Sequence, residues 1–573
     1  MKVSDYISHF LHAQGVPTVF EVVGGMITHL LDSVHRHGKI RVVSMHHEQA
    51  ASFAADAMGR MTGIPGVAMA TSGPGATNLL TGIGSCYFDS SPAVFITGQV
   101  NRNEQKRNLA IRQLGFQETD IVAMAAPITK AAWRVESPEE IPFVMREAFR
   151  IALSGRPGPV LVDIPMDVQR AQVDAGTITR ADVSEDGDVD EQLLQRMLRD
   201  LSAAERPLIL AGGGIRAAGA IEPFRALVNQ LGIPVVNSLL AVDVLPFDHP
   251  LRGGMIGSYG NRWNNLALGQ SDFILVLGSR LDIRQTGSDT DAFKASRVLY
   301  HVDMEAGEIN NRVKGCQPVL THLQPFFRGA SRLASGRVFP DRSGWLEKIN
   351  SLRRDWPDTA ESKDVRGINP NVFMHALSQA SGRAAAFTVD VGQHQMWAAQ
   401  SLELQSHQRF LTSGGMGAMG FALPAALGAA FATPTTPVVM IAGDGGFQLN
   451  LQELQTIVRN RLPIKMVVLN NQCHGMVRQF QQSYFDEQYQ STYWGYSAPD
   501  FARVAGAYGI AASTVQSPAD LAAALELMWQ DPAEPFLLQV MIDTFANAYP
   551  KIAFGHPLTE MEPLAKPIGM EST

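Results

Sequence analysis

Cysteine is scarce in this sequence: Cys86, Cys316 and Cys473 are the only three in 573 residues. They lie far apart and form no C-x-x-C pair, which argues against a zinc site and against a disulfide framework. This usage fits a reducing compartment, so we expect a cytoplasmic protein. The amino-terminal stretch MKVSDYISHFLHAQGV has apolar residues at helical spacing, and we do not expect it to be a secretory signal.

Long apolar runs and a strong net charge are also missing. The stretch between Arg409 and Asp444 carries no charge, but glycines and prolines interrupt it before the roughly 20 consecutive apolar residues that a membrane-spanning helix needs. We therefore expect no membrane segment. The net charge of −8 is small for this length and no basic cluster stands out, which argues against nucleic acid as a partner.

What the sequence does contain is a repeated alternation of strand-length apolar runs and helical patterns. A chain of 573 residues is too long for one core, and the alternation predicts an α/β fold with doubly wound parallel sheets. We expect domains at residues 1–175, 190–345 and 365–545, followed by a tail or lid at 546–573. The Asp-, Ser- and Gly-rich stretch from Asp174 to Glu191 is predicted to be a linker.

The clearest functional pattern lies in residues 438–471, VVMIAGDGGFQLNLQELQTIVRNRLPIKMVVLNN. Val438–Ala442 and Ile464–Leu469 have the length and composition of strands. The stretch Leu451–Asn460 between them predicts a helix with Asn450 as its N-cap. The segment is therefore expected to form a βαβ unit.

In a right-handed βαβ unit, Asp444 and Asn471 follow the carboxyl ends of two parallel strands, which is the edge where ligands of such sheets bind. A carboxylate and an amide oxygen suit Mg²⁺, and the neighbouring glycines let the backbone approach a phosphate. An ordinary turn is the alternative for GDG alone. With the second element at the end of the next strand, the pattern favours a Mg²⁺-diphosphate site.

Glu48 is predicted to open an Ala-rich helix in the first domain. The H-E-x-x-H zinc motif fails here, because Ala51 stands where the second histidine is needed. A favourable interaction with the helix dipole would also explain a carboxylate at this place. The loop TSGPGATN, from Thr71 to Asn78, is by itself a weak signal of an anion site.

Two further regions leave alternatives open. In the middle domain, Gly212, Gly214 and Ala217 approximate a dinucleotide fingerprint, but the expected acidic residue is not clearly placed, so a purely structural α/β module is an equal alternative. Arg280 and Asp282 are suited to phosphate and ribose contacts or to pairing with each other. In the last domain, Gln393 and His394 follow a predicted strand, where they could hold a diphosphate or be structural.

A family resemblance joins these separate signals. HHEQAA, TSGPGATN, YFDSSPAVFITGQV, GFQETDIV, GRPGPVLVDIP, VGQHQMWAAQ, GGMGAMGFALPAA and GDGGFQ…NN resemble the thiamine-diphosphate-dependent acetohydroxyacid (acetolactate) synthase family, in motif order over nearly the whole chain. The resemblance implies three doubly wound domains that bind the pyrimidine (1–175), FAD (190–345) and the diphosphate (365–545). It also implies thiamine diphosphate, Mg²⁺ and FAD as cofactors, and a homodimer or homotetramer with active sites between subunits.

The resemblance also implies roles for individual residues. Glu48 is expected to contact the aminopyrimidine and to be catalytic, while Asp444, Asn471 and the backbone oxygen of Cys473 are expected to bind Mg²⁺. The other expected thiamine diphosphate contacts are Gly25, Pro74, Asn78, Gln393, His394, Gly417, Met419, Gly445, Gly446, Gly475 and Met476. The expected FAD contacts are Arg156, Gly213, Ser238, Gly278, Arg280, Asp282 and Asp303. The expected substrate or acceptor contacts are Phe116, Gln117, Arg284 and Phe480.

By the same resemblance, the protein decarboxylates pyruvate and transfers the acetyl unit to a carbonyl acceptor. The acceptor side departs from the family pattern: Phe480 replaces a usual Trp, Asn101 a Pro, Met166 a Lys, Ser258-Tyr259 a Met-His pair and Ile283 an Asp. The longer NRNEQKRN segment resembles flavin-containing carboligases of the yersiniose type, which act on a ketone of a nucleotide-linked sugar.

These departures lead us to favour a keto-sugar or other ketone as acceptor, giving a tertiary alcohol, over a second 2-ketoacid. A pyruvate oxidase or decarboxylase is a less favoured reading, and so is a catalytically inactive homologue. The intact Glu48, Asp444 and Asn471 argue against the last.

Overall fold

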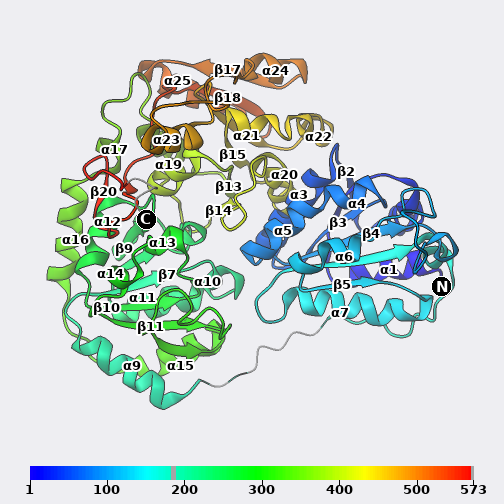
Figure 1. Ribbon diagram of the computed structural model, residues 1–573, viewed down its shortest axis with the longest axis horizontal. Coiled ribbons are helices and arrows are strands. Elements are labelled where there is room, and N and C mark those ends of the chain that lie inside the picture. Colours follow the sequence, from blue (N-terminus) through cyan, green and yellow to red (C-terminus); the bar gives the residue numbers. More distant parts are fainter. Residues whose placement is uncertain (182–186, 188, 569–573) are drawn as a thin grey trace.

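A computed structural model describes residues 1–181, 187 and 189–568 (Figure 1). Three six-stranded parallel sheets follow one another along the chain, each with its own helices, which confirms the predicted fold class. Residues 182–186 and 188 of the predicted linker and residues 569–573 of the predicted tail lie outside the described residues.

The first domain contains a sheet of order β2-β1-β3-β4-β6-β5. Its strands are β1 (Thr18–Val22), β2 (Arg41–Ser44), β3 (Gly66–Ala70), β4 (Ala93–Gln99), β5 (Ala131–Arg134) and β6 (Pro159–Pro165). Its helices are α1 (Val3–Ala13), α2 (Thr28–His37), α3 (Glu48–Thr62), α4 (Pro74–Asn78), α5 (Leu80–Asp89), α6 (Ile121–Ala125), α7 (Ile141–Leu153) and α8 (Met166–Arg170). Successive β3 residues such as Ala68 and Met69 enter different apolar clusters, so both faces of the sheet are covered.

The middle domain has the order β12-β11-β10-β7-β8-β9, the strand arrangement of dinucleotide-binding domains, which places a switch point between β7 and β10. Its strands are β7 (Pro207–Ala211), β8 (Val235–Asn237), β9 (Arg252–Met255), β10 (Phe273–Leu277), β11 (Val298–Asp303) and β12 (Gln317–Leu320). Its helices are α9 (Glu191–Ala203), α10 (Gly214–Ala217), α11 (Ile221–Leu231), α12 (Arg262–Gln270), α13 (Ile283–Thr286), α14 (Thr290–Lys294), α15 (Leu323–Ala334) and α16 (Ser343–Asp355).

The third domain repeats the strand order of the first, as β14-β13-β15-β16-β18-β17. Its strands are β13 (Ala386–Val389), β14 (Arg409–Thr412), β15 (Val438–Gly443), β16 (Ile464–Asn470), β17 (Ala511–Val515) and β18 (Phe536–Met541). Its helices, with α17 in the connection from the middle domain, are α17 (Asp358–Glu361), α18 (Pro370–Ala380), α19 (Gln393–Ser401), α20 (Ala422–Ala432), α21 (Asp444–Gln448), α22 (Leu454–Asn460), α23 (Gly475–Tyr484), α24 (Phe501–Ala507) and α25 (Leu521–Met528).

The predicted βαβ unit is present, but its helix begins differently from the prediction. Leu451–Glu453 form a 3₁₀ turn before α22, and the Asn450 side chain caps neither. Its amide donates instead to the carbonyl oxygen of Gly420, at 2.8 Å. Asn450 therefore occupies the predicted N-cap position, but its side chain makes a tertiary contact instead of capping the helix.

Helices α3 and α20 join the first domain to the third (Figure 1). Both are rich in alanine, and Gly428 of α20 lies where a Cβ atom would overlap the backbone of Ala54 in α3. The small side chains let the two helix backbones approach closely. The first and third domains are thus held together within one chain.

The segment after residue 545 packs against the middle domain. Strands β19 (Lys551–Ile552) and β20 (Met561–Glu562) pair with each other, and the amide of Ile552 donates to the carbonyl oxygen of Ser258 at 2.8 Å. Arg262 of α12 donates to the carbonyl oxygens of Met561 and Glu562. A lid function for this segment stays a prediction.

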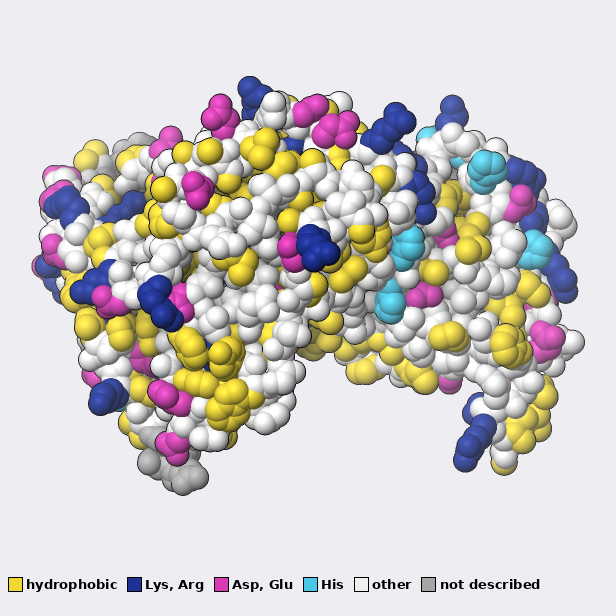
Figure 2. Space-filling model, turned by 90° about the horizontal axis from the view of Figure 1, so that it is seen from above, with side chains coloured by type: hydrophobic (Ala, Val, Ile, Leu, Met, Phe, Trp, Pro, Cys, Tyr) yellow, Lys and Arg dark blue, Asp and Glu magenta, His cyan; other side chains and the backbone are white. Residues whose placement is uncertain are grey.

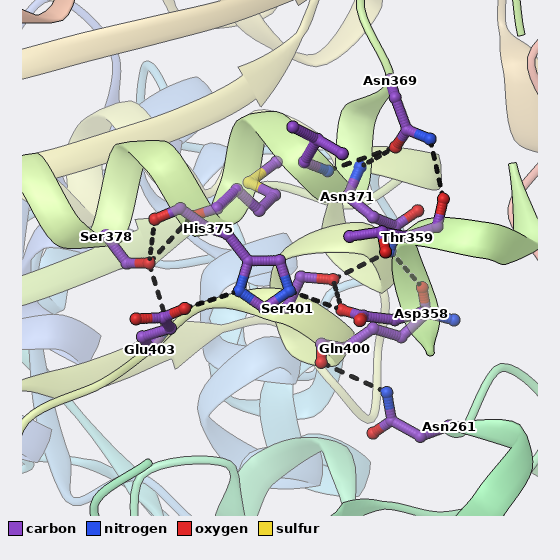
Figure 3. A network of polar contacts seen from close by, with 12 residues as sticks. Asn261, Asp358, Thr359, Asn369, Asn371, His375, Ser378, Gln400, Ser401 and Glu403 are labelled. Carbon is purple, nitrogen blue, oxygen red and sulfur yellow. Dashed lines mark hydrogen bonds and ion pairs between the residues drawn. The ribbon is translucent and has the colours of Figure 1, made fainter. Parts of the chain in front are cut away.

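A polar network lies where α17, α18 and the end of α19 meet (Figure 3). The His375 imidazole contacts the carboxylates of Asp358 and Glu403, each at 2.8 Å, and Ser401 donates to Asp358. Burial alone would lower the pKa of His375, but the two carboxylates raise it. The same contacts hold the pKa of Asp358 below its ordinary value despite burial.

Within the described residues, no helix is long and apolar enough to cross a membrane. On the face drawn in Figure 2, acidic and basic side chains are interspersed among the residues that are described. That face therefore offers no continuous basic surface to a polyanion.

Candidate active site

Asp444 and Asn471 lie side by side at the carboxyl ends of β15 and β16, which pair in parallel up to Gly443 and Leu469. The Asp444 carboxylate accepts from the amide of Gly445 at 2.9 Å and from the amide of Cys473 at 3.2 Å. The side-chain oxygen of Asn471 accepts from the same Cys473 amide, at 3.2 Å. Burial raises the pKa of Asp444 to about 6.

The donor set fits a hard cation with few protein ligands. In the part of the chain that is described, no group of three or more His, Cys, Asp or Glu side chains could hold a metal ion. A site here would use one carboxylate, one amide oxygen and the backbone oxygen of Cys473, and would leave positions for phosphate and water. That division of ligands is typical of Mg²⁺.

Gln393 and His394 begin α19 beside this cluster. The His394 ring lies against Gly443, and its pKa is lowered to about 3 by burial, so the ring is neutral. Among the described residues, His394 Nε2 and Gln393 Oε1 have no hydrogen-bond partner although both atoms are buried. Unpartnered polar atoms at such a place indicate a missing ligand or water.

Glycines let neighbouring side chains pack closely around the same group. A Cβ atom at Gly445 would lie 2.5 Å from the His474 ring and 3.4 Å from the Met419 methyl group. One at Gly475 would lie 2.8 Å from the Asn471 amide nitrogen and would overlap Gln393. The structure therefore packs Gly445 against His474 and Gly475 against Gln393 and Asn471, which brings several of the residues expected at the diphosphate together.

Glu48 belongs to a second group in the first domain. It is the first residue of α3 and is 8% exposed, and its carboxylate accepts from the side-chain amide of Asn78 at 2.9 Å. A Cβ atom at Gly75 would lie 3.1 Å from the other Glu48 oxygen. Pro74 begins α4 of the same loop, while the space beside Gly25 is open.

A cavity of about 380 Å³ lies between the middle domain and the other two. All seven residues expected to contact FAD line it, and so do Gly414–Gly417 of the third domain and Phe88–Ser90 of the first. It includes the loops after β7 and β10, at the switch point of the middle sheet.

Charged residues in this cavity differ in their partners. Arg156 is paired with Glu305 and Glu308, each at 2.9 Å. Asp282 caps α13 through the amide of Arg284, at 2.8 Å, and does not pair with Arg280. Among the described residues, Arg280 has no hydrogen bond or ion pair, so its cation is available to a ligand.

The four residues expected at the acceptor come from three domains. Phe116 is 79% exposed, and Gln117 adopts a φ of 65° beside Gly73 of the glycine-rich loop. Arg284 lines the cavity, and the Phe480 ring on α23 packs against Tyr484 in a tilted arrangement with centroids 4.8 Å apart. No contact among the described residues joins Phe116, Arg284 and Phe480 within one chain.

Three residues near Asp444 and Asn471 were not predicted as site residues from the sequence. The His474 and Tyr496 rings pack with centroids 4.3 Å apart, and the Tyr496 hydroxyl accepts from Gln448 at 3.3 Å. Asp390, which follows β13, accepts from the amides of Gly420 and Ala422. The position of Asp390 at a strand end was a usable signal, whereas nothing in the local pattern marks His474 or Tyr496.

Comparisons with known families cover all three domains. Residues 1–124 match the thiamine pyrophosphate enzyme N-terminal TPP binding domain, residues 194–329 the central domain, and residues 390–540 the C-terminal TPP binding domain. The two TPP binding domains contain the Glu48 group and the Asp444 group, respectively. Thiamine diphosphate is thus the cofactor for which these domains are named.

Individual relatives are similar from end to end. The acetolactate synthase isozyme 2 large subunit of Escherichia coli (strain K12) is 37% identical over 98% of this chain and 99% of its own. The acetolactate synthase large subunit of Lactococcus lactis subsp. lactis (strain IL1403) is 36% identical over 97% and 95%. The chloroplastic acetolactate synthase 2 of Nicotiana tabacum is 36% identical over 97% and 84%. This chain therefore belongs to the thiamine pyrophosphate enzyme family, as a thiamine-diphosphate-dependent enzyme similar over its whole length to acetolactate synthase large subunits.

Proposed function

We propose that this protein is a carboligase that releases CO₂ from pyruvate and joins the remaining acetyl unit to a second carbonyl compound. The end-to-end similarity to acetolactate synthases, at 36–37% identity, carries the proposal. The grouping of Asp444, Asn471, Gln393 and His394 at neighbouring element ends supports it. Bound thiamine diphosphate supplies the electron sink that permits loss of CO₂ and formation of the new C–C bond.

The residues around Asp444 in the third domain are suited to bind Mg²⁺ and the diphosphate. Asp444, Asn471 and the carbonyl oxygen of Cys473 would hold the metal, and the metal would offset the charge of the buried carboxylate. In the tautomer that carries its proton on Nε2, neutral His394 can donate from this unpartnered atom to a phosphate oxygen. The absence of a Cβ atom at positions 445 and 475 lets His474 and Gln393 pack against the backbone of this group.

Glu48 would hold a proton at the aminopyrimidine ring. One of its oxygens accepts from Asn78, and the other faces the glycine at position 75, where no side chain intervenes. At that place the buried Glu48 carboxylate would exchange a proton with the ring. Asn78 fixes the direction in which the carboxylate points.

We propose FAD as the ligand of the interdomain cavity. The seven lining residues, the position at the switch point and the unpaired Arg280 support this choice. Decarboxylation followed by carboligation involves no net oxidation, so the flavin is not required to change its redox state. Its role would be to brace the three domains around the site.

For the acceptor, the similarity to acetolactate synthases supports a second 2-ketoacid and gives no support to the keto-sugar that the sequence departures favoured. Arg284 on the cavity wall has no anionic partner among the described residues and can bind the acceptor carboxylate. A ketone without a carboxylate is the second candidate. Phe480 and Met166, which stand where the family resemblance expects Trp and Lys, favour it.

A homodimer or homotetramer with shared active sites also belongs to this proposal. The Glu48 and Asp444 groups lie in different domains, and Phe116, expected at the acceptor, is 79% exposed in one chain. A second copy of the chain would cover it. Location in the cytoplasm remains a proposal based on the few cysteines.

The test is product analysis with purified protein, thiamine diphosphate, Mg²⁺ and FAD. Pyruvate is supplied alone, with 2-ketobutyrate, or with butanone, and CO₂ and the products are measured. Acetolactate or acetohydroxybutyrate supports the 2-ketoacid acceptor, and a tertiary alcohol from butanone supports the ketone. Reduced flavin together with acetate would indicate oxidase activity, and free acetaldehyde as the main product would indicate decarboxylase activity. Either result would contradict carboligation.

A further inference from the structure

The turn between β14 and α20, residues 413–421, is here called the cofactor turn. It carries Gly417 and Met419, which are expected to contact thiamine diphosphate, and its first residues line the interdomain cavity. Its backbone includes positive φ angles at Gly417 and Gly420, so its shape is not set by regular secondary structure. Other groups must therefore hold it.

One end of the cofactor turn is held by the first domain. Asp89, the last residue of α5, accepts from the amide of Gly414 at 2.9 Å and from the amide of Gly415 at 2.6 Å. Its side chain is fully buried. In Figure 1, α5 lies beside β14 and α20 of the third domain.

Arg60 of α3 fixes Asp89 in turn. Its guanidinium pairs with Asp89 at 3.0 Å and with Asp56 at 2.7 Å, and it donates to the carbonyl oxygen of Thr412 at 2.8 Å. The carboxylate and the guanidinium thus bind Thr412, Gly414 and Gly415 of the third domain. The side chains that make this contact are buried or nearly buried.

The other end of the cofactor turn is held within the third domain. Asp390 accepts from the amides of Gly420 at 3.0 Å and Ala422 at 2.9 Å. The Ser413 hydroxyl accepts from the amide of Ala418 at 3.1 Å. Two buried carboxylates therefore bracket the stretch that contains Gly417 and Met419.

We propose that Asp89 is a positioning residue for the thiamine diphosphate site, holding the cofactor turn so that Gly417 and Met419 face the cofactor. The inference rests on the proposed function, in which those two residues contact the cofactor. Through Asp89, the packing of the first domain sets the geometry of a site in the third. Asp89 itself does not touch the cofactor in this arrangement.

The substitution Asp89→Asn tests this role with little change in volume. An asparagine has one acceptor oxygen where aspartate has two, so at least one of the amides of Gly414 and Gly415 loses its partner. Asp272→Asn is the matched control. Asp272 also accepts from two consecutive amides, those of Glu205 and Arg206, each at 2.9 Å, but lies at the edge of the middle domain.

The main readout is the Kd for thiamine diphosphate at saturating Mg²⁺, from tryptophan fluorescence of the full-length protein. We expect Asp89→Asn to raise this Kd about tenfold or more, the effect of one buried amide left without a partner. The near-ultraviolet circular dichroism of the bound cofactor should change, and kcat should fall more than KM for pyruvate rises. Asp272→Asn should leave the Kd, the dichroism band and the kinetic constants unchanged.

A wild-type Kd and dichroism band in Asp89→Asn would overturn the inference, as would equal effects in Asp272→Asn. If Asp89→Asn does not fold, Arg60→Lys decides the matter. Lysine keeps a cation beside Asp89 but offers a single nitrogen where the Arg60 guanidinium reaches Asp89, Asp56 and Thr412 through three separate nitrogens, so a smaller rise in Kd supports the inference and an unchanged Kd refutes it. A wild-type protein that binds no thiamine diphosphate would instead refute the proposed function itself.

Discussion

Asp444→Asn is expected to stabilise the metal-free protein while abolishing Mg²⁺ binding. Burial raises the pKa of Asp444 from 3.8 to about 6 in the folded state. The difference of roughly 2 units corresponds to about 3 kcal/mol by which the ionised carboxylate destabilises the fold above pH 6. Asparagine removes the charge but loses one acceptor for the amides of Gly445 and Cys473, which costs about 1 kcal/mol.

The net gain is therefore about 2 kcal/mol at pH 8. If the third domain unfolds as one unit, this raises Tm by about 4–8 °C. The assay is thermal unfolding of both proteins in EDTA at several pH values. Because the pKa of Asp444 is raised from 3.8 to about 6 in the folded state, its destabilising effect develops between these two pH values and is complete above about pH 6, so the difference in Tm should shrink towards pH 5.

Mg²⁺ and thiamine diphosphate should reverse this order. They bind the folded wild-type protein and raise its Tm, but they should not raise the Tm of Asp444→Asn. A metal-free wild type that is more stable than the variant at pH 8 would refute the reasoning, as would a difference that does not depend on pH.

Two further substitutions address other parts of the structure. Glu48→Gln should leave the fold and the Kd for Mg²⁺ and thiamine diphosphate largely intact but remove most turnover, since an amide cannot hold the proton; undiminished kcat would count against its role. His375→Gln should lower Tm most at low pH. The carboxylates of Asp358 and Glu403 raise the pKa of His375, so its stabilisation is complete below about pH 6.5 and is lost as pH rises through the raised value. The Tm gap to wild type should narrow as pH rises above about 6.5, and a widening gap would contradict this explanation.

The fold and the pairing of Asp444 with Asn471 could be predicted, because both follow from the pattern of apolar residues along the chain. Apolar runs of strand length predicted β15 and β16, and the parallel crossover placed Asp444 beside Asn471. The seven residues expected at FAD line one cavity for a similar reason, since several of them follow strands of a sheet whose switch point creates the space.

The remainder depends on contacts between distant segments, which local patterns do not encode. Asn450 has the residue type of an N-cap, yet its amide bonds to Gly420 across the domain. Asp89 and Gly414 are separated by more than half the chain, and only the packing of α3 on α20 brings them together. The Tyr496 ring reaches His474 through an irregular segment that has no periodic pattern.

The central claim, carboligation from pyruvate, is tested most directly by following carbon from [2-¹³C]pyruvate by NMR. The wild-type protein with thiamine diphosphate and Mg²⁺ should move the label into a product in which the former keto carbon bears a new C–C bond. One CO₂ should be released for each bond formed, and Asp444→Asn should form none. Label that appears only in acetate or acetaldehyde, or that stays in pyruvate while the cofactors are bound, would contradict the claim.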